Sequence, residues 1–85
     1  MIDQDIKKFV LRALLSRNGD PMSSREIKLL IRGAFNAALT EGMLDTCITQ
    51  LEESKLIAGT DEDLTGIVWT LTSKGTIRAQ QLVKV

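Results

Sequence analysis

Two short strings decide the fold: LEESKLI at residues 51–57 and WTLTSKG at residues 69–75, which flank an acidic segment. The first string completes an amphipathic helix, because apolar residues before and within it recur at a spacing of three and four. The second begins with alternating apolar and polar residues, the pattern of a half-buried strand. Two extended segments around a glycine-bearing tip at residues 59–66 indicate a β-hairpin. The strings therefore predict a helix, a hairpin and a last helix over about residues 74–83.

Three helices are predicted upstream, because apolar residues recur there at helical spacing. The first covers about residues 3–16, the second begins at a capping box made by Ser23 and Glu26, and Thr40 caps the third. The helix after the hairpin is capped by Thr72 or Ser73, and it carries Ile77 and Leu82. The side chains expected to face the core from the first three helices are Ile6, Phe9, Val10, Ala13, Leu14, Ile27, Leu30, Ile31, Ala34, Leu44, Cys47, Ile48 and Leu51. The order helix, helix, helix, hairpin, helix predicts one α+β domain over residues 1–85 with a dominant helical core.

Composition excludes several classes of function. The 85 residues include one cysteine and no histidine, and 11 basic residues balance 11 acidic ones. A disulfide scaffold, a Cys/His zinc site and a Ser-His or Cys-His nucleophile pair are therefore excluded. No enzymatic activity and no cofactor are expected. No apolar run approaches the ~20 residues of a membrane helix, and we expect a reducing, cytoplasmic location.

The paired strings resemble those of winged-helix proteins in the multiple-antibiotic-resistance-regulator and PadR-like branches. In these branches the third helix ends in a similar Leu-Glu-x-x-x-Leu-Ile string, and the wing returns into a Leu-Thr-x-x-Gly string that starts the next helix. The resemblance covers about residues 23–82. It implies a three-helix core, a β-hairpin wing and a C-terminal helix. It also implies a DNA-binding regulator, commonly dimeric, with the third helix in the major groove and the wing beside the backbone.

Two sets of residues are candidates for DNA contacts. The second helix carries a basic stripe that suits phosphates, formed by Arg25, Lys28 and Arg32. The outward face of the third helix offers polar side chains that suit base edges, namely Thr46, Thr49 and Gln50. The alternative interpretation is that both sets are solvated surface that keeps the protein soluble.

The charge distribution leaves two functions open. Residues 39–66 hold one basic residue against seven acidic ones, a net charge of −6, and they include the third helix and the wing. Negative charge there opposes phosphate binding, so any binding to duplex DNA is predicted to be weak and to use the second helix. The alternative is a winged helix that works as a protein-interaction module and meets a basic partner through its acidic third helix and wing.

A homodimer is also predicted. Leu11 and Leu15 form a second apolar stripe on the first helix, nearly opposite the core-facing one, and this stripe needs a partner. Leu82 and Val83 near the other end of the chain could supply it.

Three features receive ordinary structural interpretations. Trp69 is expected to cover the core under the wing, and Cys47 to act as a small buried hydrophobe. The segment from Asp61 to Gly66 imitates the start of a calcium loop, but Thr72 stands where the bidentate glutamate is required, so a hairpin tip is expected instead of a metal site.

Overall fold

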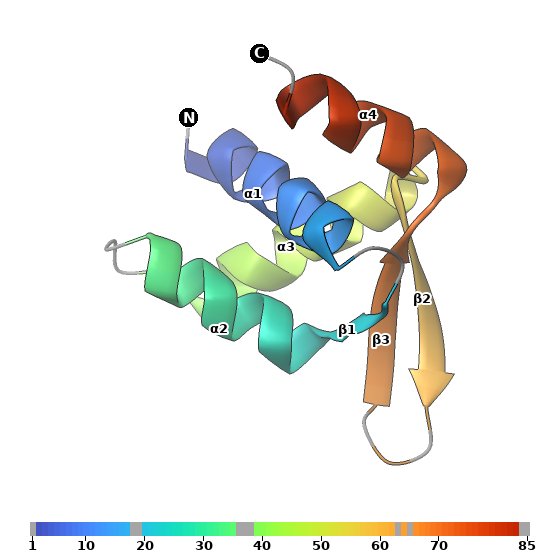
Figure 1. Ribbon diagram of the computed structural model, residues 1–85. Helices are drawn as coiled ribbons and strands as arrows, with labels where there is room; N and C mark the ends of the chain where they lie inside the picture. The colour runs from blue at the N-terminus through green and yellow to red at the C-terminus, as the bar shows by residue number, and fades with distance from the viewer. Residues whose placement is uncertain (1, 18–19, 36–38, 63, 65, 84–85) are drawn as a thin grey trace.

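The chain folds around a helical core with a small sheet at one end (Figure 1). The computed structural model describes residues 2–17, 20–35, 39–62, 64 and 66–83, without the side chains of residues 2, 3 and 83. The elements are, in order, α1 (Ile2–Ser16), β1 (Met22–Ser23), α2 (Ser24–Ala34), α3 (Glu41–Glu53), β2 (Ile57–Glu62), β3 (Gly66–Leu71) and α4 (Ser73–Val83). The predicted α+β architecture and element order are confirmed. Among the described residues, no helix has both the length and the apolar character to cross a bilayer.

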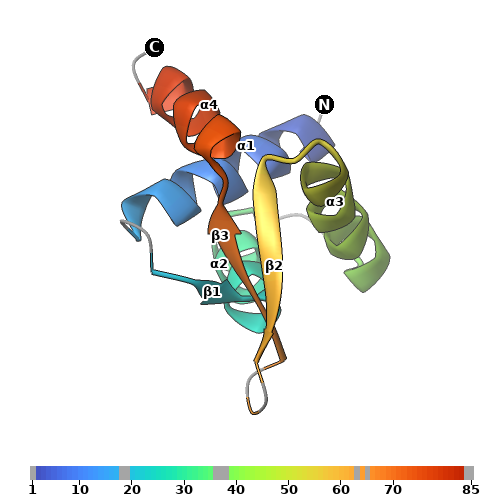
Figure 2. The ribbon, with the colours of Figure 1, turned by 90° about the vertical axis from the view of Figure 1, so that its right-hand side faces the viewer.

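The sheet has three antiparallel strands in the order β1-β3-β2. Its hairpin projects beyond the helices, as Figure 1 and Figure 2 both show. Strand β2 continues to Glu62, so the tip is shorter than the predicted segment 59–66. Strand β1 was not predicted, because its two residues, Met22 and Ser23, are too few to show any periodicity. Met22 pairs with Trp69 and is fully buried.

The core forms where α1 and α3 meet, and most predicted core residues are confirmed. The predicted core side chains that are buried are Ile6, Val10, Leu14, Ile27, Ile31, Leu44, Cys47, Ile48 and Leu51. The predictions for Leu30 and Ala34 were wrong, since both are exposed and Leu30 retains 43% of its accessible surface. On α2 only Ile27 and Ile31 are buried, so the face that this helix turns to the core is narrower than the spacing predicted.

Helix α4 packs along α1 and bears on the second apolar stripe, Leu11 and Leu15, which was predicted to bind a second copy. Leu11 is 3% exposed within a single chain, so its prediction as a dimer contact was wrong. Leu15 and Leu82 are half-buried and pack against the same core. The partner that this stripe requires therefore comes from the chain itself. The side chain of Val83 lies outside the described part of the structure. Ile77, on the outer side of α4, is exposed.

The hydrogen bonds at the end of α3 explain the sequence of the first string, residues 51–57. The Lys55 N–H donates to the Glu52 carbonyl at 2.9 Å, and the Leu56 N–H donates to the Leu51 carbonyl at 3.0 Å. This pair of bonds is a Schellman motif, which requires a left-handed residue after the helix, and Lys55 has φ 62°. Leu51 is buried and Leu56 packs against the same core, which supplies the hydrophobic contact of the motif.

The second string closes this junction from the other side. The Thr72 N–H donates to the Leu56 carbonyl at 3.1 Å, and the Thr72 hydroxyl accepts from the Gly75 N–H at 3.0 Å, so Thr72 caps α4 as predicted. A Cβ on Gly75 would lie 1.8 Å from the Leu56 carbonyl oxygen. The threonine and glycine therefore fix how closely the start of α4 approaches the end of α3.

Candidate nucleic-acid interface

The outer face of α3 is the first part of the candidate site. Thr40 caps the helix, because its hydroxyl accepts from the Met43 N–H at 3.2 Å, as predicted. Burial of four apolar residues on the inner side leaves the other side exposed along its length, with Gly42, Asp45, Thr46, Thr49, Gln50 and Glu53. The Thr46 hydroxyl donates to the Gly42 carbonyl at 2.7 Å, which occupies its proton within the helix. Thr49 and Gln50 are exposed side by side.

Helix α2 lies beside α3 and carries the predicted basic stripe. Its start matches the predicted capping box, with the Ser23 hydroxyl accepting from the Glu26 N–H. Arg17 forms an ion pair with the Glu26 carboxylate. Arg25 and Arg32 are exposed, whereas the Lys28 side chain keeps only 22% of its accessible surface. The structure therefore brings all three cations onto one helix, but it gives them different surroundings.

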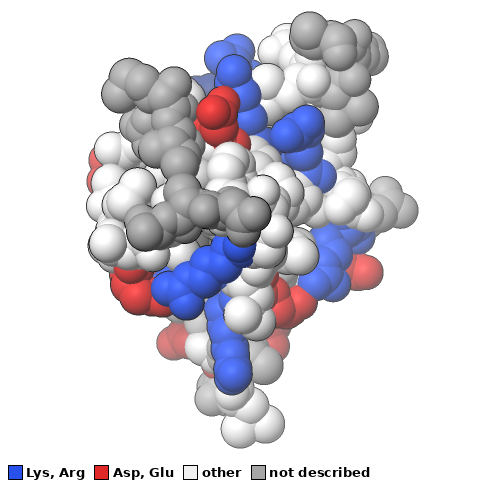
Figure 3. Space-filling view, turned by 90° about the vertical axis from the view of Figure 1, so that its left-hand side faces the viewer, with Lys and Arg blue, Asp and Glu red and all other residues white. Residues whose placement is uncertain are grey.

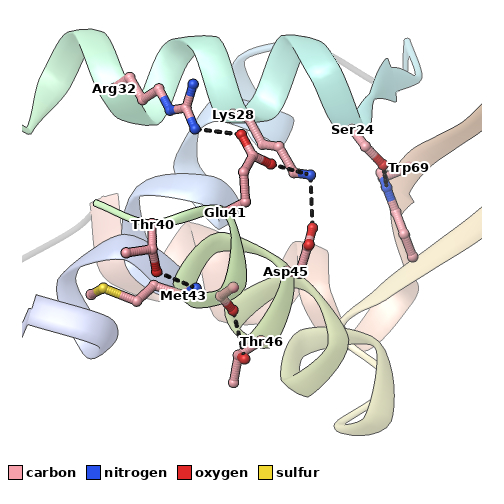
Figure 4. Close-up of polar contacts among 10 residues, drawn as sticks. Ser24, Lys28, Arg32, Thr40, Glu41, Met43, Asp45, Thr46 and Trp69 are labelled. Atoms are coloured by element: carbon pink, nitrogen blue, oxygen red, sulfur yellow. Dashed lines mark hydrogen bonds and ion pairs between the residues drawn. The ribbon is translucent and has the colours of Figure 1, made fainter. Parts of the chain in front are cut away.

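Ion pairs join the stripe to the first turns of α3 (Figure 4). The Lys28 Nζ lies 2.9 Å from a Glu41 carboxylate oxygen and 2.7 Å from an Asp45 carboxylate oxygen. Arg32 pairs with the other Glu41 oxygen. We call these four residues the interhelical network. Among the described residues of the stripe, only Arg25 has no ion-pair partner.

The network shifts the pKa values of Glu41 and Lys28. The hydrogen bond from Lys28 is the main cause that lowers the pKa of Glu41, with the charges of Lys28 and Arg32 adding to it. The hydrogen bond to Asp45, followed by that to Glu41, raises the pKa of Lys28. Glu41 and Lys28 are thus charged at neutral pH. Since the carboxylates are exposed, the network orients the helices more than it stabilises the fold.

The network was not predicted from the sequence. Glu41 and Asp45 are four residues apart and so lie on one side of a helix, which is a visible signal. Their contact with Lys28 and Arg32 depends on the angle between α2 and α3, which no local pattern encodes. The consequence is that two of the three predicted phosphate contacts already hold carboxylates.

The wing is held to α2 by Trp69. Its indole N–H donates to the Ser24 hydroxyl at 2.7 Å, and its ring is buried, which confirms the prediction that it covers the core. Beyond it the hairpin exposes Asp61 and Glu62, while Leu64 is 98% exposed.

The calcium-like string at residues 61–66 lies only partly within the described residues. Two of its oxygen-bearing positions, Asp63 and Thr65, lie outside the described residues. In the described part of the chain, no three His, Cys, Asp or Glu side chains are grouped to hold a metal ion.

Positive and negative side chains are mixed on the face of the molecule that lies on the left in Figure 1. Figure 3 shows Lys and Arg side chains interspersed with Asp and Glu, and no continuous basic surface. Attraction to a polyanion on this face therefore depends on a few local cations.

The comparisons with known proteins support the architecture. No protein-family model and no curated protein matches the chain. The solved structure of SSV1 F-93 is similar to it, with a TM-score of 0.70 over 92% of this chain and 82% of that one. The two sequences are 14% identical, so the likeness concerns the fold. Three core helices, a hairpin wing tied to α2 and a last helix across α1 together show that this chain has the winged-helix fold.

Proposed function

We propose that the protein is a non-enzymatic, DNA-binding regulator or accessory protein that presents α3 to the major groove and α2 to the backbone. The observation that carries the proposal is the outer face of α3, exposed along its whole length beside a projecting wing. A major groove admits one helix, and a glutamine such as Gln50 can bond an adenine through two hydrogen bonds. The resemblance to the multiple-antibiotic-resistance-regulator and PadR-like branches supports the same role, and membership of either branch is part of the proposal.

The interhelical network makes this binding weak. Lys28 and Arg32 must exchange their carboxylate partners for phosphates, whereas Arg25 is available at once. Affinity for DNA rests largely on cations that replace condensed counterions. We therefore expect binding at low salt that falls steeply toward physiological ionic strength, with Arg25 as the leading phosphate contact.

Fluorescence anisotropy tests the proposal. A labelled duplex of about 30 base pairs is titrated with protein at about 50 and about 200 mM salt, and each phosphate neutralised adds about −0.9 to the slope of log affinity against log salt. The Arg25→Ala variant should weaken binding several-fold and reduce the slope by about 1. Arg12→Ala removes the same charge from the exposed side of α1, and it should change the affinity less.

Sequence preference tests the role of α3 separately. Duplexes that bind tightly are selected from a random pool, and their affinities are compared with those of unselected duplexes. The double variant Thr49→Ala, Gln50→Ala should reduce this difference, since base contacts carry specificity and phosphate contacts do not. If the wild-type protein does not bind duplex DNA even at about 50 mM salt, the proposal fails. The acidic α3 and wing would then be explained by a basic protein partner.

A further inference from the structure

Strand β2 lies at the end of the sheet, and its side away from β3, which we call the β2 edge, is open. The strand order β1-β3-β2 places only β3 beside it within the described residues. No described residue outside the sheet forms a backbone hydrogen bond with Ile57–Glu62, and all of these residues after Ile57 are exposed. Figure 1 and Figure 2 both show the half of β2 nearest the tip clear of the helices on this side. The edge therefore presents backbone N–H and C=O groups to which an extended segment can add as a further strand.

The β2 edge lacks the proline and lysine residues that commonly block strand addition. Ala58, Gly59 and Thr60 are small, so a neighbouring backbone can approach closely. Asp61 and Glu62 make the edge negative, and neither forms an ion pair with a described residue. Pairing of two such edges would bring the carboxylates of both copies together, which disfavours self-association through β2. The same charges favour a strand that carries positive charge.

The register of the hairpin gives the two faces of the edge different character. Gly59 pairs with Trp69, and Asp61 pairs with Ile67 on the same face. Glu62 follows Asp61 and so points to the opposite face. A Cβ on Gly59 would lie 2.8 Å from the Trp69 ring and 3.1 Å from the Ile67 side chain, so both side chains extend over β2. Because Ile67 is 47% exposed, the edge is apolar beside Gly59 and negative two residues further along the same face.

We propose that the β2 edge binds an extended segment of a partner protein that reads, from its N-terminus, basic, basic, any residue, apolar. The segment adds antiparallel to β2, the pairing that is slightly more stable per residue. Its two basic side chains lie beside Glu62 and Asp61, one on each face of the wing. Its apolar side chain lies beside Gly59 and contacts Ile67. The basic residues must be neighbours because the two carboxylates are neighbours. Duplex DNA fits this edge poorly, since the carboxylates repel phosphates.

Fluorescence anisotropy of a labelled peptide, measured without DNA, tests the inference. The probe contains the string Lys-Arg-Thr-Val-Thr, with fluorescein at its N-terminus and an amidated C-terminus. The control peptide has the same composition in the order Lys-Thr-Val-Thr-Arg. We expect the probe to bind with a Kd on the order of 100 µM and the control to bind at least about fivefold more weakly. Since charge and composition are equal, the order of the residues must cause the difference.

Methylated peptides test whether the segment adds as a strand. Successive amide N–H groups of a strand point to opposite edges, so only every second one faces β2. The first threonine and the valine of the probe follow one another, and each is N-methylated in a separate peptide. One of these peptides should bind at least about tenfold more weakly than the probe, and the other should bind nearly as well as the probe.

Variants of the protein identify the site. The double variant Asp61→Asn, Glu62→Gln should weaken binding of the probe about tenfold. The matched control, Asp5→Asn, Glu53→Gln, removes the same charges from exposed positions on α1 and α3. It should change the affinity by less than about twofold. Circular dichroism reports whether each variant is folded, and the methylated peptides test strand addition on the wild-type protein whatever the variants do.

Four results would overturn the inference. Equal binding of the probe and the control peptide would show that charge alone attracts them, and an equal loss in both double variants would show the same. Equal effects of the two methylations would show that the peptide does not add as a strand. No binding at about 1 mM protein would show that the edge accepts no such segment. Because DNA is absent, none of these results bears on the proposed function, on which the inference does not depend.

Discussion

Gly75, in the first turn of α4, is the residue on which the junction between the two strings most depends. An alanine Cβ would lie 1.8 Å from the Leu56 carbonyl oxygen and 2.8 Å from its carbon, and both atoms belong to the backbone. No side-chain rotation relieves such a contact, so the start of α4 must move away from the end of α3. We expect Gly75→Ala to lower the free energy of unfolding by about 3 kcal/mol or more, measured by urea denaturation.

Gly33 provides the matched control. It lies in a helix, as Gly75 does, but an added Cβ there meets no atom within 4 Å. Alanine favours helix over glycine, so Gly33→Ala should raise the free energy of unfolding by up to about 1 kcal/mol. If both substitutions have the same effect, the close approach at Gly75 is not what requires glycine.

Lys55 is the second residue with a specific backbone demand. Its φ of 62° places it in the left-handed region, which costs an L-residue about 1–2 kcal/mol. Lys55→Gly removes that cost but raises the conformational entropy of the unfolded chain. We therefore expect a net stabilisation of about 0.5–1 kcal/mol in the same measurement. Lys55→Ala separates the two effects. It removes the same side chain beyond Cβ and keeps the left-handed cost, so it should not stabilise the protein.

At the scale of elements, the interhelical network sets how much positive charge α2 offers to DNA. Glu41 contacts both Lys28 and Arg32, so Glu41→Gln should free Arg32 for phosphates and leave Lys28 paired with Asp45 alone. We expect the affinity for duplex DNA to rise several-fold, and the salt slope to steepen by about one. Fluorescence anisotropy at several salt concentrations measures both quantities.

Glu53→Gln is the control for this prediction. It makes the same charge change on the same helix, and Glu53 forms no ion pair with a described residue. It should raise the affinity less and leave the salt slope nearly unchanged. If the two variants behave alike, overall charge decides DNA binding and the network has no separate role.

The ion pairs of Lys28, Glu41 and Glu26 predict how stability depends on pH. The pKa of Glu41 and that of Glu26 are lowered below 4.5, the latter by the Ser23 backbone hydrogen bond first and by Arg17 second. The stabilisation from lowered carboxylate pKa values is present above 4.5 and is lost as pH falls through the lowered values. The raised pKa of Lys28 contributes below 10.5, and its contribution is lost as pH rises above that value.

Thermal unfolding followed by circular dichroism checks this window. The Tm of the wild type should fall on acidification below about pH 4.5 and again above about pH 10.5. The Glu41→Gln variant should show a smaller decrease on the acidic side than Glu53→Gln. A wild-type Tm that stays constant between pH 5 and pH 3 would contradict the assignment.

The elements themselves were predictable where local chemistry decides them. The Ser23–Glu26 capping box, the Thr40 cap and the inward stripe of α3 all follow from spacing along one helix, and the structure confirms them. Features that depend on two elements were not predictable. Strand β1 forms by pairing Met22 with Trp69, and Leu30 is exposed because α2 turns only a narrow face, with Ile27 and Ile31, to the core.

In the candidate site, too, features within one helix were predictable and contacts between two helices were not. The exposure of Thr49 and Gln50 follows from the buried stripe on the other side of α3, so the sequence predicts it. The pairing of Lys28 with Glu41 and Asp45 spans two helices, so the sequence predicts the charges but not their neutralisation. The same holds for Leu11, whose partner is a helix more than 60 residues later in the chain.

At the scale of the whole molecule, α2 has two unlike faces. One carries the cations of the network, and the other exposes Leu29, Leu30, Gly33 and Ala34. This flank brings together two exposed leucines beside residues small enough for a second helix to approach closely. We predict that a homodimer forms through this flank, with the same patch on both copies.

Such a dimer should be weak. Burying Leu29 and Leu30 from both copies contributes several kcal/mol at ~25 cal/mol per Å², while association costs at least about 4 kcal/mol. In sedimentation velocity we therefore expect the apparent mass to rise from 9.4 kDa toward twice that value between about 10 µM and about 1 mM. Leu29→Glu should keep the protein monomeric over this range. Leu64→Glu makes the same change at the fully exposed wing tip and should not. A monomer at every concentration, or an equal effect of both substitutions, would exclude α2 as the interface.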